Sequence, residues 1–356
     1  ESKHDGMDEG NMQSRRRHVR KKLELKDYVK GIWEQDKVVL ARAITLVESN
    51  SSEHILLAQE LIREILPNTG KSIRIGITGV PGAGKSTLIE ALGIFLISLG
   101  HKVAVLAVDP TSSLSKGSIL GDKTRMEILS RNDKCFIRPS PSGGTLGGVT
   151  KKTRETTLLC EAAGYDVIII ETVGVGQSEI TVRSMVDFFL LLKIAGAGDE
   201  LQGIKRGIME LVDAIVINKA DGENIPMAEM AKNEFERAIH YLKPVTEKWI
   251  PQVLTCSAVE NRNIDSIWDI IMEFEKATKE SGFFLSRRNK QLKDWLHAMI
   301  QEYLQNSFYR NPAVSEVINK IETEIIKGEK PVTKAVQELI YIFNQANVKD
   351  KSKNFK

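Results

Sequence analysis

Gly79-Val80-Pro81-Gly82-Ala83-Gly84-Lys85-Ser86 matches the pattern GxxxxGK[ST], and this stretch decides the fold. It follows a β-branched apolar run at residues 73–77 and opens a helical pattern at residues 86–97. A strand, a glycine-rich turn and a helix in that order are the setting in which the motif forms a phosphate-binding loop, or P-loop. A glycine turn that matched the pattern by chance would not be expected to lie between a strand and a helix. The residues expected to bind the nucleotide are Gly79, Gly82, Ala83, Gly84, Lys85, Ser86 and Thr87.

Each residue type in this loop has a chemical role. The glycines let backbone N–H groups turn inward around phosphate oxygens, and the helix N-terminus adds positive potential. Lys85 is expected to reach the β- and γ-phosphates as a catalytic cation, while the Ser86 hydroxyl binds Mg²⁺. The motif therefore predicts Mg²⁺ as the cofactor, together with a nucleoside triphosphate.

Short apolar runs alternate with helical stretches on both sides of the loop. Further buried strands are expected at residues 103–108, 167–170, 188–192 and 215–217, with a shorter candidate at 253–256. Nearly continuous apolar strands separated by helices indicate a mostly parallel sheet that is covered by helices on both faces. The fold class is therefore α/β, a P-loop NTPase.

Helical extensions are expected at both ends of the chain. Periodic apolar residues predict helices at residues 37–48, 53–65, 292–303, 314–326 and 332–343. We divide the chain into an N-terminal helical arm at 1–70, a P-loop domain at 71–282 and a helical C-terminal extension at 283–356. The first thirty or so residues are polar, and we expect them to be mobile.

Asn218-Lys219-Ala220-Asp221 predicts which base is bound. The stretch follows an apolar strand, so it lies at the carboxyl edge of the sheet, where ligands bind. A carboxylate there accepts two hydrogen bonds from the N1–H and 2-amino groups of guanine, a donor pair that adenine lacks. Ser257-Ala258, after the next strand, resembles the loop that supports the guanine carbonyl. We therefore predict guanine recognition by Asn218, Lys219, Asp221, Ser257 and Ala258.

Two acidic residues follow strands at the same edge as the P-loop. Asp109 comes directly after the strand at 103–108, and Glu171 after the strand at 167–170. Glu171-Thr172-Val173-Gly174 has the form of a DxxG switch with Glu in place of Asp, and its glycine N–H can contact a γ-phosphate. A helix cap or a solvated charge is the alternative for each acid. The topology favours catalytic and Mg²⁺-binding roles for Asp109 and Glu171.

Six segments together resemble the MeaB/ArgK/MMAA family of GTPase chaperones of cobalamin-dependent acyl-CoA mutases. They are GITGVPGAGKST at 76–87, VDPTSSLSKGSILGDKTRM at 108–126, RPSPSGGTLGG at 138–148, ETVGVGQSE at 171–179, GAGDELQGIKRG at 196–207 and NKAD at 218–221. The long strings at 108–126 and 196–207 are far more specific than the P-loop.

The resemblance implies GTP hydrolysis and a mutase partner, chiefly methylmalonyl-CoA mutase, whose cofactor loading the GTPase gates and which it protects. It places Asp109, Asp122 and Glu171 with Ser86 in the Mg²⁺ and switch network. It assigns the loop at 196–207 to mutase contact, through Asp199, Glu200, Gln202 and Lys205. The family is homodimeric through its C-terminal extension. Two features depart from expectation: Val175 stands where a switch Gln usually follows the glycine, and Lys193 follows the strand at 188–192.

Rival functions remain open. A nickel-insertion metallochaperone GTPase needs clustered His or Cys ligands, and the six histidines here do not cluster with cysteines. A P-loop kinase of a transport system would not be expected to carry NKAD. A nucleotide-gated scaffold with incidental hydrolysis is disfavoured by the intact Lys85 and Mg²⁺ residues.

The composition of the chain bears on which classes of partner and which cellular compartment are expected. A net charge of +3 over 356 residues gives no reason to expect nucleic acid or a membrane as a partner. The basic run at residues 15–22 is interpreted as a solvated arm. We expect no signal peptide and no membrane span. Cys135, Cys160 and Cys256 are widely spaced, which favours a reducing, cytoplasmic location.

Overall fold

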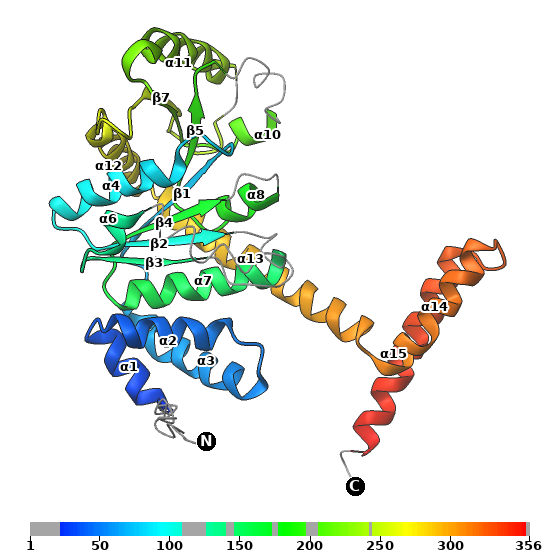
Figure 1. Cartoon of the computed structure of the whole chain (residues 1–356). Helices are drawn as coiled ribbons and strands as arrows, with labels where there is room; N and C mark the ends of the chain where they lie inside the picture. Colours follow the sequence, from blue (N-terminus) through cyan, green and yellow to red (C-terminus); the bar gives the residue numbers. More distant parts are fainter. Residues whose placement is uncertain are drawn as a thin grey trace, which may run out of the picture.

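Parallel strands form one sheet in the order β3-β2-β4-β1-β5-β6-β7 (Figure 1). The computed structural model describes residues 22–108, 126–139, 146–172, 177–196, 206–241 and 244–353. The strands are β1 (Ile73–Gly79), β2 (Val103–Val108), β3 (Cys135–Arg138), β4 (Val167–Thr172), β5 (Phe188–Ile194), β6 (Ala214–Asn218) and β7 (Gln252–Thr255). Every neighbouring pair is parallel, so all the carboxyl ends lie along one edge. This confirms the predicted fold class.

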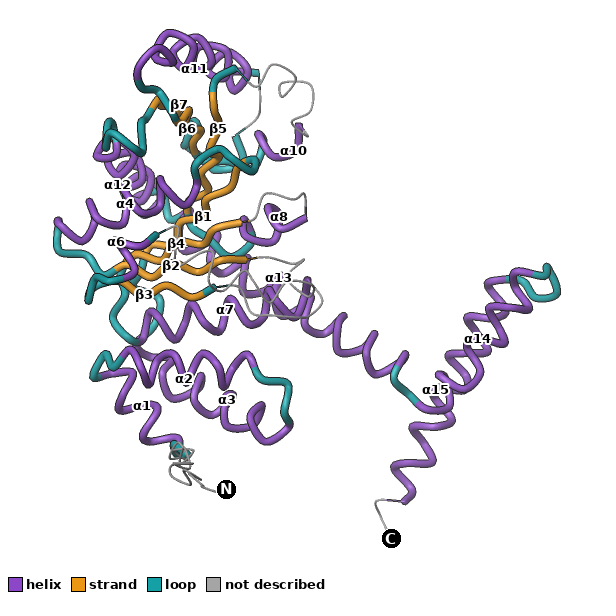
Figure 2. Tube along the Cα trace, viewed as in Figure 1, coloured by secondary structure: helices purple, strands orange, loops and turns teal. Residues whose placement is uncertain are grey.

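Helices cover both faces of the sheet (Figures 1 and 2). One apolar cluster joins odd-numbered residues of β1, such as Ile75 and Ile77, to helices α4 (Lys85–Ser98), α6 (Glu127–Ser130) and α12 (Ile264–Glu280). The other cluster joins the opposite face to α7 (Leu146–Ala162), α8 (Gln177–Arg183) and α11 (Ile225–His240). Because strand side chains alternate between faces, the strands are buried on both sides and read as nearly continuous apolar runs.

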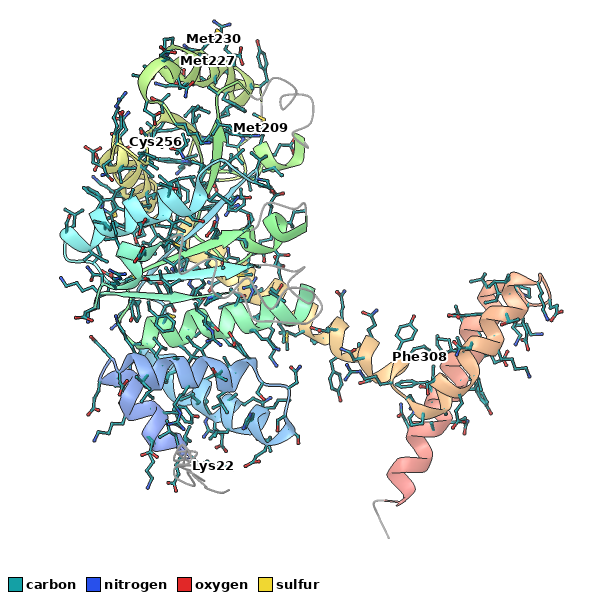
Figure 3. The ribbon with its side chains drawn as sticks, viewed as in Figure 1. Lys22, Met209, Met227, Met230, Cys256 and Phe308 are labelled. Atoms are coloured by element: carbon teal, nitrogen blue, oxygen red, sulfur yellow. The ribbon has the colours of Figure 1, made fainter. Side chains whose placement is uncertain are left out.

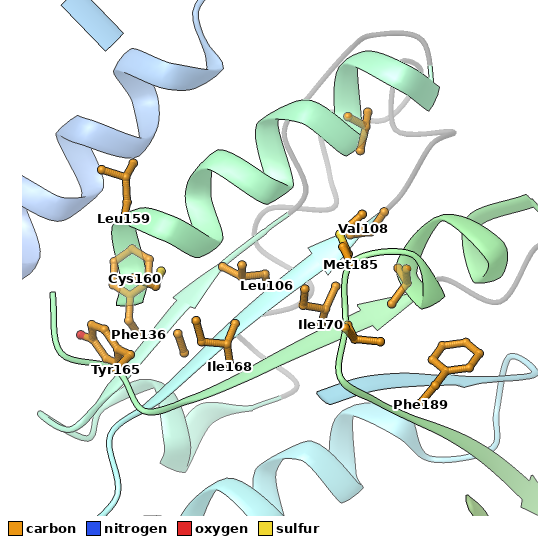
Figure 4. Packing of buried hydrophobic residues seen from close by; sticks show 14 of the residues in the cluster. Leu106, Val108, Phe136, Leu159, Cys160, Tyr165, Ile168, Ile170, Met185 and Phe189 are labelled. Atoms are coloured by element: carbon orange, nitrogen blue, oxygen red, sulfur yellow. The ribbon is translucent and has the colours of Figure 1, made fainter. Parts of the chain in front are cut away.

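Three N-terminal helices extend the second cluster beyond α7. They are α1 (Leu25–Trp33), α2 (Lys37–Glu48) and α3 (Ser52–Ile65), followed by the 3-10 turn η1 (Leu66–Asn68). Figure 4 shows α7 between these helices and the sheet, with Leu159 and Cys160 above Leu106 and Ile168. An ion pair between Arg138 of β3 and Glu48 of α2 ties the outer layer to the edge of the sheet.

A long helix, α13 (Phe283–Tyr309), leaves the body from the amino-terminal ends of the strands. Arg288 holds its start through Asp187, which precedes β5, with Nη2 2.6 Å from Oδ2. Arg287 lies 3.4 Å from Asp213, which precedes β6. Helices α14 (Pro312–Ile326) and α15 (Val332–Lys353) then form a hairpin away from the body, where Phe308 packs against Phe343 (Figure 3).

The structure differs from the sequence-based expectations in a few elements. Strand β3 and helix α1 were not predicted, and α1 lies partly in the segment expected to be mobile. Tyr28 and Ile32 of α1 are buried, which explains why this polar stretch packs. Further short elements are α10 (Arg206–Met209) and the 3-10 turn η3 (Gly222–Asn224). Most of the loop at 196–207, including Gln202, lies outside the described residues.

Candidate functional site

The P-loop joins β1 to α4, and its glycines are required by backbone conformation and by space. Gly79, Gly82 and Gly84 have φ of 154°, 84° and 89°, which side-chain-bearing residues rarely adopt. A Cβ on Gly79 would lie 2.4 Å from the Leu192 carbonyl oxygen, and a Cβ on Gly84 would lie 2.5 Å from Asn218 Nδ2. The loop therefore packs against β5 and β6 as closely as backbone allows.

Lys85 is the first residue of α4, and its ammonium lies inside the loop. Nζ donates to the carbonyl oxygens of Gly79, over 2.7 Å, and of Val80, over 3.3 Å. The side chain is only 9% exposed. A buried ammonium surrounded by carbonyl oxygens is available to a phosphate at the mouth of the loop. Ala83 is buried, whereas Thr87, two residues after Lys85, is exposed.

Ser86 of α4 and Glu171 of β4 bring two side-chain oxygen atoms together. Ser86 Oγ donates to Glu171 Oε1 over 3.3 Å. The register pairs Glu171 with Ile77 of β1, so both side chains point to the α4 face, beside the P-loop. A hydroxyl next to a carboxylate, at the start of a phosphate-binding helix, is a donor set that fits Mg²⁺. Glu171 ends the apolar part of β4 as predicted, although the strand continues to Thr172.

Asn218 connects the NKAD stretch to the P-loop. Its Nδ2 donates to the Ala83 carbonyl oxygen over 2.8 Å, and its Oδ1 accepts from the Ala258 N–H over 3.2 Å. Cys256 Sγ also contacts Oδ1, at 3.4 Å. The side chain of Asn218 is 2% exposed, so these bonds are protected from water. Asn218 thus bridges the phosphate loop and the loop after β7.

Asp221 is held in place from the loop after β7. Ser257 Oγ donates to Asp221 Oδ2 over 2.6 Å, and the Glu260 N–H donates to Ser257 Oγ over 3.2 Å. Arg262 closes this loop by pairing with the Ser257 backbone and by donating to the Ala220 carbonyl oxygen over 3.1 Å. The Asp221 carboxylate is therefore held in one orientation by the loop after β7. Lys219 is exposed and has φ of 59°, an uncommon conformation for a residue with a side chain.

Comparison with known proteins identifies the family. The model of the methylmalonyl-CoA mutase-associated GTPase MeaB matches residues 40–313. This chain belongs to the MeaB family. GTPase ArgK of Escherichia coli K12 is 50% identical over 81% of this chain and 87% of its own length. The mouse protein named methylmalonic aciduria type A homolog, mitochondrial, is 45% identical over 88% of this chain and 78% of its own.

A solved structure gives the same answer for the fold of this MeaB family member. The crystal structure of a protein called LAO/AO transport system kinase matches with a TM-score of 0.73 and 40% identity, over 90% of this chain and 97% of that one. Relatives in the family carry the name GTPase, and the described site has the P-loop and NKAD geometry of that class. The chain is a GTPase.

Several residues predicted for the site of this MeaB family member lie outside the described residues. They are Asp109, Asp122, Gly174, Asp199, Glu200, Gln202 and Lys205. Among the described residues, the structure brings together the P-loop, Glu171, Asn218, Asp221, Ser257 and Ala258, which come from β1, β4, β6 and the segment after β7.

Sequence reasoning missed three features of the region around the site. It treated Asn218 as a base reader, while the structure also shows its bond to Ala83. It gave no role to Arg262, for which no motif exists. It expected Lys193 beyond the strand, whereas Lys193 lies within β5 and is 3% exposed.

The cysteines of the chain do not form a metal site. Cys135, Cys160 and Cys256 are free and buried. Burial, and to a smaller extent Asp221, raises the pKa of Cys256 to about 12, which keeps its thiol protonated. Within the described part of the chain, no group of three or more His, Cys, Asp or Glu side chains could hold a metal ion.

No helix among the described residues is both long enough and apolar enough to cross a lipid bilayer.

Proposed function

We propose that this GTPase is a chaperone of a cobalamin-dependent acyl-CoA mutase, with methylmalonyl-CoA mutase as the partner. In this role it gates the loading of the cobalamin cofactor and protects the mutase. The observation that carries the proposal is the match to a mutase-associated GTPase family over residues 40–313. The name of the mouse relative, which refers to methylmalonic aciduria, points in the same direction.

The roles proposed for site residues follow from their contacts. Lys85 would leave the carbonyl oxygens of Gly79 and Val80 and bind the β- and γ-phosphates. Ser86 and Glu171, with Asp109 and Asp122, would hold Mg²⁺, which when bound neutralises charge on the β- and γ-phosphate oxygens. Asp221, oriented by Ser257, would accept the N1–H and 2-amino donors of guanine.

A homodimer is part of the proposal, and the C-terminal arm supports it. Helices α13 and α15 expose a row of large apolar side chains: Leu292, Leu296, Ile300, Leu304, Val336 and Ile340, each 45–59% exposed. Exposed apolar side chains on the helices of this arm form the kind of surface that a second subunit covers. A cytoplasmic location is proposed from the three free cysteines.

The decisive experiment measures GTP hydrolysis with and without purified methylmalonyl-CoA mutase. We expect release of phosphate to water, accelerated by this mutase and by no unrelated enzyme. If isobutyryl-CoA or ethylmalonyl-CoA mutase accelerated hydrolysis and methylmalonyl-CoA mutase did not, the chaperone role would stand with a different partner. Hydrolysis that no mutase changes would contradict the proposal.

A second candidate is suggested by the name of the protein in the matching crystal structure, which is called a transport system kinase. Incubation with γ-labelled GTP separates the two functions. A kinase would transfer the label to a protein acceptor, whereas the proposed chaperone releases it as inorganic phosphate.

A further inference from the structure

A chain of buried hydrogen bonds joins the base of the P-loop to helix α8. Thr172 Oγ1, at the end of β4, donates to Thr78 Oγ1 over 2.8 Å. Thr78 Oγ1, in β1, donates in turn to Glu179 Oε1 of α8 over 3.3 Å. Thr78 and Thr172 are fully buried, and Glu179 is 5% exposed. None of the three residues belongs to the nucleotide contacts assigned above.

The direction of these bonds is set by the groups themselves. A hydroxyl has one hydrogen to donate, and an ionised carboxylate only accepts. The donors therefore run from Thr172 through Thr78 to Glu179, and each bond in such a chain polarises the next. Lys193 is also buried and lies on the same face of the sheet, two positions beyond Leu191, the register partner of Thr78.

Packing along β1 shows how closely α8 sits on this face. A Cβ on Gly76 would lie 3.0 Å from Val182 Cγ1 of α8 and 2.7 Å from Phe189 Cδ2 of β5. At the end of α8, Arg183 Nη2 lies 3.6 Å from Asp213 Oδ2. The helix is thus held at its carboxyl end by packing and an ion pair, and at its first turns by the bond from Thr78 to Glu179.

The three residues stand at the points where the chain enters or leaves nucleotide-binding segments. Thr78 immediately precedes Gly79 of the P-loop. Thr172 is the last residue of β4 and follows Glu171, while Glu179 lies in the first turn of α8. One hydroxyl, that of Thr78, therefore ties the P-loop strand to both the end of β4 and the start of α8.

We infer that Thr78, Thr172 and Glu179 are positioning residues for GTP hydrolysis. They keep the end of β4 and the start of α8 in register with the P-loop, and so hold Glu171 beside Ser86 at the start of α4. The inference rests on the GTPase activity and not on the mutase partnership. It therefore concerns the intrinsic rate, measured without any partner.

The alternative is a buried polar cluster that only stabilises the fold. That alternative predicts that losing the Thr78 hydroxyl lowers both the melting temperature and the GDP affinity. It also predicts that the catalytic constant falls by no larger a factor than the GDP affinity does. The positioning role predicts that the catalytic constant falls while the GDP affinity does not. GDP has no γ-phosphate, and its binding depends on the P-loop amides, which the loss of the Thr78 hydroxyl leaves in place.

The test uses Thr78→Val, which keeps the shape of the side chain and removes the hydroxyl, and Thr78→Ser, which keeps the hydroxyl. Single-turnover GTP hydrolysis, GDP affinity by fluorescent-nucleotide titration and the melting temperature are measured for each. Thr157→Val is the matched control, because the Thr157 hydroxyl is similarly buried and, among the described residues, donates to the Thr153 carbonyl oxygen within α7.

We expect Thr78→Val to lower the hydrolysis rate by roughly 10- to 100-fold, in line with the cost of misplacing a catalytic constellation by about 1 Å. Its GDP affinity should stay within about twofold of the wild type, and Thr78→Ser should restore the rate. Thr172→Val, which leaves the bond from Thr78 to Glu179 in place, should have a smaller effect in the same direction. A Thr78→Val rate that matches that of the Thr157→Val control, or a rate loss no larger than the loss of GDP affinity, overturns the inference.

Discussion

Asn218, the last residue of β6, donates through Nδ2 to the carbonyl oxygen of Ala83 in the P-loop, over a distance of 2.8 Å. The same side chain accepts from the Ala258 N–H. The loop proposed to read the base and the loop proposed to bind the phosphates are therefore joined by one buried amide. Gly84 must be glycine for this contact, because a Cβ there would meet Asn218 Nδ2 at 2.5 Å.

Asn218→Ala should weaken GTP and GDP binding by similar factors. The substitution removes both bonds and leaves the Ala83 carbonyl and the Ala258 N–H without their partner, at a cost of about 1–3 kcal/mol. Calorimetry with both nucleotides measures the effect. Asn233→Ala is the control, since within the part of the chain that the structure describes Asn233 Nδ2 donates to the Glu229 carbonyl oxygen of α11, its own helix. Unchanged affinity in Asn218→Ala would show that the bridge has no role in binding.

Asp221→Asn should change the base that is preferred. Wild-type protein should bind guanine nucleotides more tightly than adenine nucleotides by on the order of 3–5 kcal/mol, the cost of losing a charged, buried pair of hydrogen bonds. The amide of Asn can donate to the 2-oxo group of xanthine, so the variant should favour XTP over GTP. Competition titrations with GTP, XTP and ATP check this, and Asp265→Asn, at an exposed position in α12, is the control. Equal affinity of the wild type for ATP and GTP contradicts the assignment.

Glu171→Ala should raise the Mg²⁺ concentration needed for half-maximal hydrolysis. The variant keeps Ser86 and the P-loop but loses the carboxylate that lies 3.3 Å from the Ser86 hydroxyl. Hydrolysis is followed as Mg²⁺ is titrated, and GDP binding in the presence of a chelator reports whether the fold of the loop is intact. A normal Mg²⁺ dependence would make Glu171 a structural residue that only anchors Ser86.

Much of this site could be predicted from sequence because its parts are local. The P-loop glycines, Lys85 and Ser86 lie in one short stretch, and NKAD follows one strand, so spacing and strand order place them at a common edge. Strand β3 was missed because it has only four residues, Cys135–Arg138, at the edge of the sheet. Helix α1 was missed because few of its residues are buried.

Contacts between distant residues could not be predicted in the same way. Thr78 and Glu179 are about a hundred positions apart in the sequence, and no pattern in either segment predicts the hydrogen bond between them. The ion pair between Arg288 and Asp187 likewise depends on how α13 crosses the amino-terminal ends of the strands. Such pairs can be predicted only when the order of the strands in the sheet is known, because that order decides which strand ends become neighbours.

Leu296→Glu together with Ile300→Glu should convert the proposed dimer to a monomer. Both side chains lie on α13, 58% and 45% exposed, and a charge there cannot be buried without a partner. Light scattering coupled to gel filtration gives the mass. Ile128→Glu is the control, because Ile128 is 69% exposed but lies on the body at α6. A wild-type chain that is monomeric at high concentration would contradict the dimer.

The segment between β5 and α10 is the part of the chain that we propose transmits nucleotide state to the mutase. β5 ends at Ile194; Gly196, with φ of 81°, is the last described residue after it, and α10 begins at Arg206. The carboxyl end of β5 lies beside Gly79 of the P-loop, so we expect a partner bound to the segment that follows β5 to be close to the nucleotide. Assistance from a partner in other GTPases raises the rate by about 10³–10⁵.

The double variant Asp199→Ala, Lys205→Ala should keep the basal GTPase rate and the nucleotide affinities of the wild type. It should lose the acceleration of hydrolysis by methylmalonyl-CoA mutase, since the polar contacts to the partner are gone. Because linkage between two binding sites is reciprocal, the variant should also bind the mutase with the same affinity whichever nucleotide is present. Steady-state hydrolysis with increasing mutase distinguishes this from an ordinary connection, which would leave the acceleration at its wild-type value.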